Sequence, residues 1–233
     1  MLPIRWVSRN EMLTNYVAHF KDLKGSPHGL PDSEIEGHHK FIMNVFGFEP
    51  PAGADSVNPV GDDTPSLIKP KAGFSVGYLK AKPHNGPVLH NHNTNETFIP
   101  LAGTWRFTWE ASPAHMETVD LGPYDTVSFP PGVPRAFENL VPAADSDEGL
   151  LLAIVDQDAP ISEAMPGVKD LLMKVNKGEL PMLQTGPADL KGANGASAGP
   201  KTANAAAPNP AEPNKEHKGK SILMTTKAGG FGG

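Results

Sequence analysis

Two histidines and a glutamate lie close together near the middle of the chain. His90 and His92 are two residues apart, and Glu96 follows His92 by four residues. Residues two apart on a β-strand point to the same face, so both imidazoles would project together. The polar run 93–95 can bend the chain and bring Glu96 toward the same side. Two imidazoles and one carboxylate on one face predict a divalent-metal site with open coordination positions for water, oxygen or substrate.

A pair of histidines on a strand can also be an ordinary polar face. The spacing of Glu96 and the glycine at position 103 favour the metal site over that interpretation. The chain has no cysteine, which excludes disulfides, thiolate ligands and a cysteine nucleophile. Any metal must therefore be held by histidine or carboxylate side chains.

The other histidines and one arginine are weaker candidates. His84 could be a spare ligand or an acid/base group at the mouth of the pocket, but we expect it to be an exposed loop residue. We expect His38 and His39 to lie on the surface. His115 is expected in an exposed hairpin. Arg106 could be a second pocket cation or simply a solvated side chain.

Short strands are predicted on both sides of the motif. The segments whose apolar or alternating pattern predicts strands are 41–46, 74–79, 104–109, 126–129 and 150–155. Trp105, Phe107 and Trp109 alternate with polar residues, so they form one apolar face, which we interpret as core or dimer interface. Short strands at regular spacing indicate a closed or sandwiched β fold.

Helical and low-complexity segments flank the strands. Ser8 and Glu11 fit a capping box, and apolar residues recur at helical spacing after it, which predicts a short helix over 8–23. A second helix is predicted after Pro166. Between 186 and 220 the only large apolar residue is Leu190, so this stretch has little surface to bury. We therefore predict an N-terminal helical extension at 1–40, a barrel at 41–160, a C-terminal helical segment at 161–184 and a disordered low-complexity tail at 185–233.

The central motif resembles the first signature of the cupin superfamily. The pattern H-x-H-x3-E-x6-G is matched by His90, His92, Glu96 and Gly103. The glycine that leads this signature is displaced, because only three residues separate Gly86 from His90.

The second cupin signature is matched in part. Its proline, glycine and asparagine positions are filled by Pro130, Gly132 and Asn139. The stretches 37–47 and 94–98 are similar to those of small single-domain bacterial cupins with a type-2 cupin domain. The resemblance covers about 73–155 and implies an all-β fold, the cupin double-stranded β-helix or jelly-roll barrel. The segments outside it add the short N- and C-terminal helices and the disordered C-terminal tail predicted above.

Arg135 stands where the second signature has its histidine. Arginine stays protonated and has no lone pair for a metal. In the interpretation we prefer, the site has three ligands and Arg135 anchors a substrate carboxylate or enolate. In the alternative, Arg135 forms an ion pair with Glu96 and the site no longer binds metal.

The resemblance implies a metal-dependent cupin enzyme that acts on a small organic anion. The simplest form is an Fe(II) dioxygenase, in which the metal binds substrate and oxygen at open positions. Fe(II) is the favoured metal, with Mn, Ni or Zn as alternatives. A non-redox isomerase or decarboxylase and a metal-free small-molecule-binding cupin remain as alternatives, because a fold does not determine a function.

Charge and hydropathy limit the partners. The net charge is −6, and no Lys/Arg cluster is present, which argues against nucleic-acid binding. No apolar run approaches the length of a membrane span. The N-terminus lacks the basic and apolar regions of a secretory signal, so we expect a cytoplasmic protein. Cupin barrels commonly pair through their sheets, so we also expect a homodimer.

Overall fold

The structure is a computed structural model that describes residues 2–50, 58–61, 64–168, 170 and 172. The predicted tail at 185–233 lies outside the described residues, as does the predicted C-terminal helical segment from residue 173 onward. Within the described ranges, no helix has the length and apolar character needed to cross a membrane.

The N-terminal helix is shorter than its sequence pattern predicts. The helix α1 spans Arg9–Asn15, and a separate 3-10 turn spans Phe20–Asp22. The Ser8 hydroxyl accepts a hydrogen bond from the Glu11 N–H at 3.1 Å, as the capping pattern predicts. No side chain of α1 is buried. A helix this short is not extended by propensity alone, because most helical stability in proteins comes from packing.

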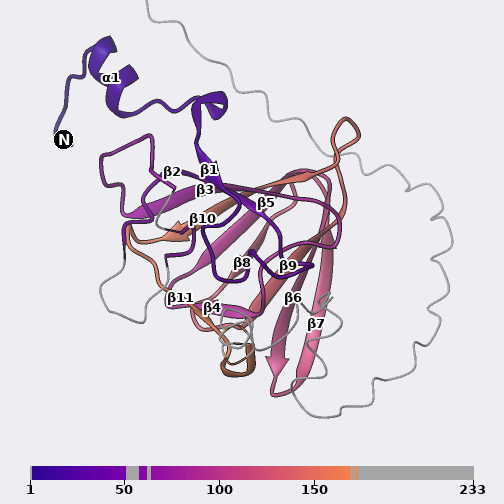
Figure 1. The fold of residues 1–233 in the computed structure, drawn as a ribbon. Helices are drawn as coiled ribbons and strands as arrows, with labels where there is room; N and C mark the ends of the chain where they lie inside the picture. The colour runs from indigo at the N-terminus through magenta and orange to yellow at the C-terminus, as the bar shows by residue number, and fades with distance from the viewer. Residues whose placement is uncertain (1, 51–57, 62–63, 169, 171, 173–233) are drawn as a thin grey trace, which may run out of the picture. The chain divides into compact units, whose positions relative to one another are not determined.

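Two antiparallel sheets form the body of the protein (Figure 1). One sheet has the order β1 (Gly25–Ser26), β2 (Phe41–Phe46), β3 (Phe74–Ala81), β10 (Gly149–Asp156), β5 (Glu96–Ala102), β8 (Val127–Phe129). The other has the order β11 (Ser162–Ala164), β4 (His90–His92), β9 (Arg135–Val141), β6 (Thr104–Ser112), β7 (His115–Leu121). Strands distant in sequence are neighbours in both sheets, as in a jelly roll. The predicted all-β jelly-roll fold is confirmed.

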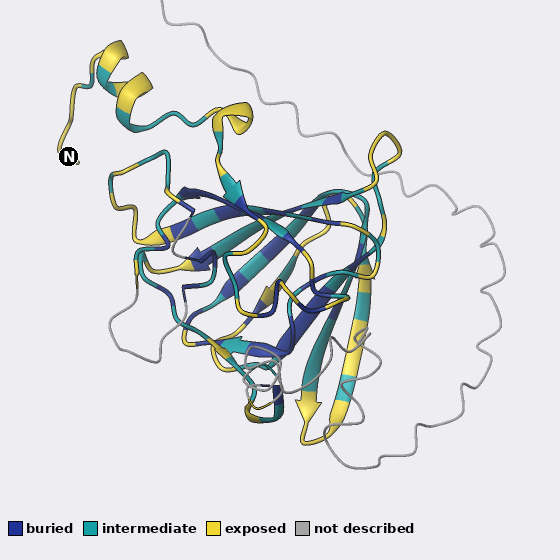
Figure 2. Cartoon of the chain, viewed as in Figure 1, coloured by how far each residue is buried: buried dark blue, intermediate teal, exposed yellow. Residues whose placement is uncertain are grey.

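The apolar face of β6 lies in the core. Trp105 and Phe107 are both 0% exposed, and they pack with Phe98, Phe129 and Phe137 between the sheets (Figure 2). Of the two roles expected for this face, the structure assigns the core. The homodimer stays a prediction, but it loses the argument that this face needs a partner to cover it.

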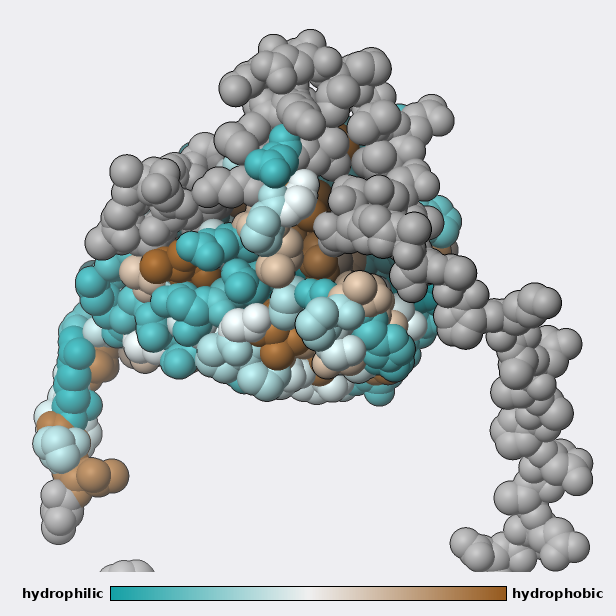
Figure 3. Space-filling model, turned by 90° about the horizontal axis from the view of Figure 1, so that it is seen from below, coloured by the Kyte–Doolittle hydropathy of each residue, from teal (hydrophilic) through white to brown (hydrophobic). Residues whose placement is uncertain are grey.

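Exposed apolar side chains occur elsewhere. The face drawn in Figure 3 mixes hydrophilic residues with small hydrophobic patches. Among the described residues, the most exposed large hydrophobic side chains are Leu2 and Trp6 in the N-terminal segment, followed by Tyr124 and Ile4. Scattered exposed apolar residues are normal on soluble proteins and do not by themselves define an interface.

A strand precedes the predicted C-terminal helix. β11 pairs antiparallel with β4, with Ser162 opposite His92 and Ala164 opposite His90. Residues 166–168, 170 and 172 are helical, in agreement with a helix after Pro166. The strand was not predicted because its pairing partner lies far away in the sequence, and local periodicity does not report such a contact. β11 therefore provides the pairing partner along one edge of β4, the strand that carries both histidines.

Candidate metal centre

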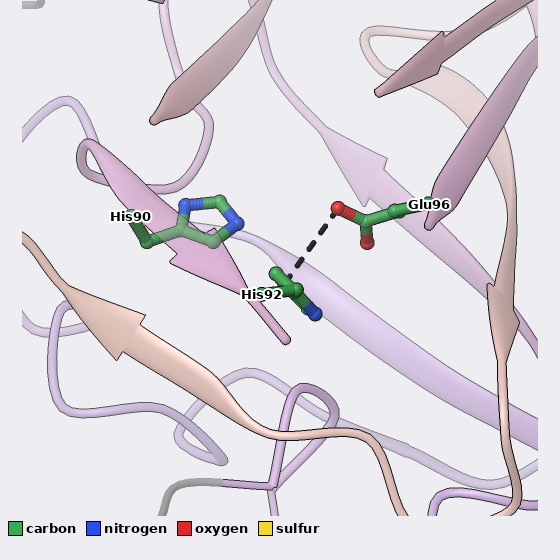
Figure 4. Close-up of side chains that lie close together, drawn as sticks. All are labelled: His90, His92 and Glu96. Atoms are coloured by element: carbon green, nitrogen blue, oxygen red, sulfur yellow. Dashed lines mark ion pairs between the residues drawn. The ribbon is translucent and has the colours of Figure 1, made fainter. Parts of the chain in front are cut away.

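The three predicted ligands converge on one point inside the barrel (Figure 4). Their ligand atoms all lie within 4.8 Å of one another. His92 Nε2 lies 3.6 Å from Glu96 Oε2, and the two imidazole centroids are 5.2 Å apart. His90, His92 and Glu96 are 8%, 3% and 5% exposed, respectively, so the cluster is shielded from bulk water.

Two different sheets supply these side chains. His90 and His92 point inward from β4, while Asn91 between them is only partly buried and lies opposite Glu163 of β11. The bend at 93–95 then carries the chain from one sheet to the other, where Glu96 begins β5. The carboxylate therefore meets the imidazoles across the barrel interior rather than from the same strand.

Both imidazoles are neutral in this environment. Burial, with the nearby His92 and Arg135, lowers the pKa of His90 to about 3. Burial and the positive charge of Arg135 hold the pKa of His92 well below its usual value. Neutral imidazole is the form that binds a metal. Low pKa values therefore keep both lone pairs available at neutral pH.

Hydrogen bonding fixes the orientation of one imidazole. His90 Nδ1–H donates to the Val88 carbonyl at 2.7 Å, because a carbonyl can only accept. His90 therefore carries its lone pair on Nε2, which is the usual arrangement of a metal-binding histidine. His92 Nδ1 is buried and has no hydrogen-bond partner among the described residues. This donor set of two neutral imidazoles and a carboxylate fits Fe(II), Mn, Ni or Zn.

Arg135 is paired with the carboxylate of the cluster. Its side chain is 0% exposed, and its Nε and Nη2 donate to Glu96 Oε2 at 3.0 and 2.6 Å. The third contact is from Nη1 to the Val133 carbonyl at 3.2 Å. This is the ion pair of the alternative interpretation, and both bonds use Oε2, the same oxygen that lies 3.6 Å from His92 Nε2. Arg135 would have to leave Glu96 to contact a substrate, and its role as an anion anchor stays a prediction.

A cavity of about 120 Å³ opens next to the three ligands. The described residues that line it are Leu30, Pro31, Asp32, Lys40, Ile42, Phe48, Pro59, Val60, Gly77, Tyr78, Leu79, Pro87, Val88, His90, His92, Glu96, Phe98, Phe137, Ala153, Ser162, Ala164 and Leu172. The predicted cation Arg135 is not among them. A cavity this size can hold a small organic molecule and not only a single water.

The cavity wall contains an ion pair between Lys40 and Asp32 that was not predicted from the sequence. Lys40 Nζ donates to Asp32 Oδ1 at 2.6 Å, and the Val88 N–H donates to Asp32 Oδ2 at 3.0 Å. Burial alone would raise the pKa of Asp32, but Lys40 and the hydrogen bond from Val88 together outweigh burial and lower that pKa. Burial lowers the pKa of Lys40 despite the attraction of Asp32. Both residues lie in a loop region without a recognisable motif, so no local signal marks them.

The weaker candidates lie away from the cavity. The side chains of His84 and His115 are 75% and 61% exposed, near Glu138 and Glu117, as expected for loop and hairpin residues. Arg106 pairs with Asp120 on the outer part of the sheet, at 2.7 Å.

His38 contradicts the expectation of a surface residue. It is 1% exposed, and its Nδ1–H donates to the Gly86 carbonyl at 2.8 Å. Gly86 itself packs against β9, where an added Cβ would lie 1.7 Å from the Phe137 carbonyl oxygen. His38 therefore belongs to the packing that holds the segment before β4. His39 is exposed, as expected.

Several solved structures are similar to the chain at low sequence identity. No family model and no curated protein matches the chain. A cupin-2 domain, Rru_A2000 from Rhodospirillum rubrum, is 13% identical over 70% of this chain and 94% of that chain, with a TM-score of 0.42. The Lactobacillus farciminis oxalate decarboxylase, in a formate complex, is 15% identical over 74% of this chain and 42% of that chain, with a TM-score of 0.44.

A DMSP lyase, DddQ from Ruegeria pomeroyi, is 21% identical over 41% of this chain and 45% of that chain, with a TM-score of 0.34. The strand order of the two sheets agrees with the jelly-roll fold that the resemblance in the sequence implies. The chain spans less than half the length of the decarboxylase and of the lyase, and the similarities concern the fold alone.

Proposed function

We propose that this chain is a metal-dependent cupin enzyme that acts on a small organic anion. The observation that carries the proposal is the convergence of two neutral imidazoles and a carboxylate within 4.8 Å, beside a cavity. The side chains of His90, His92 and Glu96 would hold a divalent ion, with Fe(II) favoured over Mn, Ni or Zn. Such an ion supplies Lewis-acid chemistry, or redox chemistry in the case of Fe(II), at its open coordination positions.

The charges around the cavity support an anionic substrate. Glu96 and Arg135 neutralise each other, and so do Asp32 and Lys40. A divalent ion would therefore add two positive charges that the described side chains leave uncompensated. Two uncompensated charges are costly in a largely apolar interior, so an anionic ligand would stabilise the loaded site.

Residues around the candidate ligands orient them and keep the cavity dry. Val88 orients His90 through the Nδ1–H bond, and Arg135 holds Glu96 Oε2 in place. The apolar wall excludes water from the bound ligand. The favoured reaction class is that of an Fe(II) dioxygenase, and a non-redox isomerase or decarboxylase is the alternative with the same ligands.

Metal analysis tests the proposal directly. Protein produced with iron, manganese and nickel available is expected to carry roughly one divalent ion per chain. His92→Ala should lose the ion and keep the fold, while the exposed-residue control His84→Ala should keep both. Wild-type protein that binds none of these ions in a direct titration would contradict the proposal. Oxygen consumption with candidate substrates then separates the dioxygenase from the non-redox alternative.

One observation favours a metal-free small-molecule-binding cupin instead. The Arg135–Glu96 pair neutralises the only carboxylate of the candidate metal cluster. In that function the cavity binds its ligand with the same affinity whether or not a chelator is present. Ligand titrations with and without chelator decide between the two.

A further inference from the structure

We infer that the cavity selects a small monoanion with an apolar body and discriminates against ligands that carry a second charged group. The inference rests on the proposed function, because the metal would receive the single anionic group. The rest of the ligand would then contact the described wall of the cavity.

That wall is mainly apolar. Its apolar side chains come from both sheets and from the loops before β2 and β4, and they include Leu30, Ile42, Phe48, Val60, Leu79, Val88, Phe98 and Phe137. Tyr78 is one of the lining residues, but its ring packs edge-to-face against Phe20, with the ring centroids 5.1 Å apart. Alternation along β3 puts its side chain on the face opposite to the buried Leu79, so its hydroxyl points away from the cavity. Ser162 contributes a hydroxyl, which is polar but uncharged.

Lys40, the cation in this wall, already has hydrogen-bond and ion-pair partners. Lys40 Nζ donates to Asp32 Oδ1 at 2.6 Å and to the His38 carbonyl at 3.0 Å, and its side chain is 0% exposed. Arg135 is committed to Glu96 and does not line the cavity. Lys40 in the described wall and Arg135 behind it are therefore both already paired, and neither is free to pair with a second carboxylate of a ligand.

These features set opposite trends for two kinds of ligand. Each methylene buried against the wall should raise affinity about fourfold. A carboxylate at the far end of the same carbon chain would be buried without a partner, which is strongly unfavourable. A six-carbon monocarboxylate should therefore bind more tightly than the six-carbon dicarboxylate. This order is the reverse of what attraction to the positive metal alone would give, because the dicarboxylate has the larger negative charge.

Calorimetric titration of the Zn²⁺-loaded protein with butanoate, hexanoate and adipate tests this inference. Hexanoate should bind about tenfold or more tightly than butanoate, which follows from two added methylenes, and at least about tenfold more tightly than adipate. Adipate binding as tightly as hexanoate, or affinity independent of chain length, would overturn the inference.

A second measurement is independent of the metal. Ethanol and hexan-1-ol are titrated into chelator-treated protein, where only the apolar wall is tested. Hexan-1-ol should bind and ethanol should not, even if no metal binds and the proposed function fails. Equal binding of the two alcohols would overturn the inference while leaving the metal site intact.

Asp32→Asn tests the role of the wall ion pair. Removing the charge of Asp32 releases Lys40, so the preference for hexanoate over adipate should shrink at least threefold. The matched control is Asp120→Asn, which releases the exposed Arg106 outside the cavity and should leave the preference unchanged. An unchanged preference in folded Asp32→Asn would overturn the assignment of Lys40. If that variant does not fold, the wild-type acid and alcohol series decide the inference.

Discussion

Replacing Arg135 with methionine tests the ion pair that lies beside the candidate ligands. The side chains of Arg135 and Glu96 are 0% and 6% exposed, so water screens their charges very little. Removing one partner of a buried pair costs about 3–5 kcal/mol, because the other charge is left unpaired. We therefore expect the free energy of unfolding of the metal-free protein to fall by about 3–5 kcal/mol in Arg135→Met.

The same substitution should strengthen metal binding. Arg135 repels a divalent ion and occupies Glu96 Oε2, so its removal favours the metal on both counts. Residues in contact are coupled by about 0.5–3 kcal/mol. A gain of about 1.4 kcal/mol in the free energy of metal binding, within that range, would make Zn²⁺ binding to Arg135→Met about tenfold tighter. If Arg135 instead anchors a ligand anion, metal affinity should stay the same and carboxylate affinity should fall.

Urea unfolding in chelator and calorimetric titration with Zn²⁺ measure the two effects. Arg106→Met is the control, because its pair with Asp120 is 39% and 44% exposed and is worth less than about 1 kcal/mol. The double variant Glu96→Gln/Arg135→Met removes both charges and should recover most of the lost stability. A loss below about 1 kcal/mol in Arg135→Met, with unchanged Zn²⁺ affinity, would show that the buried pair does not form in solution.

Three further predictions concern stability and assembly. Burial lowers the pKa of His38, His90 and His92, so the unfolded state binds more protons than the fold. Stability in chelator should therefore be constant above about pH 6.5 and fall toward pH 3, by up to about 1.4 kcal/mol per pH unit for each histidine, as followed by urea unfolding. Gly86→Ala should destabilise by more than about 3 kcal/mol in the same assay, because its Cβ would meet backbone, while Gly122→Ala, whose Cβ would make only an ordinary contact with Asp125 Oδ2 at 3.9 Å, should cost less than about 1 kcal/mol. The expected homodimer is contradicted if light scattering at micromolar concentration gives a mass near 24.7 kDa.

The sequence predicted the candidate cluster and several of the strands. Alternation along a strand, a local property of the backbone, predicted that His90 and His92 point to the same side, and the polar run 93–95 predicted the bend that brings Glu96 to them. Alternating apolar residues likewise predicted that Trp105 and Phe107 lie on one face, and the structure places that face in the core. The absence of cysteine already limited the ligands to histidine and carboxylate.

Only the tertiary structure decided which charges meet. Arg135 and Glu96 are 39 residues apart in sequence, and Asp32 meets the Val88 N–H across 56 residues. Pairings over such separations depend on how the sheets and loops pack, and no local periodicity encodes them. The sequence left open whether Arg135 faces a ligand or Glu96, and packing places it on Glu96. The same packing buries His38 and seals Lys40 against Asp32, because a charged or polar group inside the barrel is stable only where a partner compensates for its lost hydration.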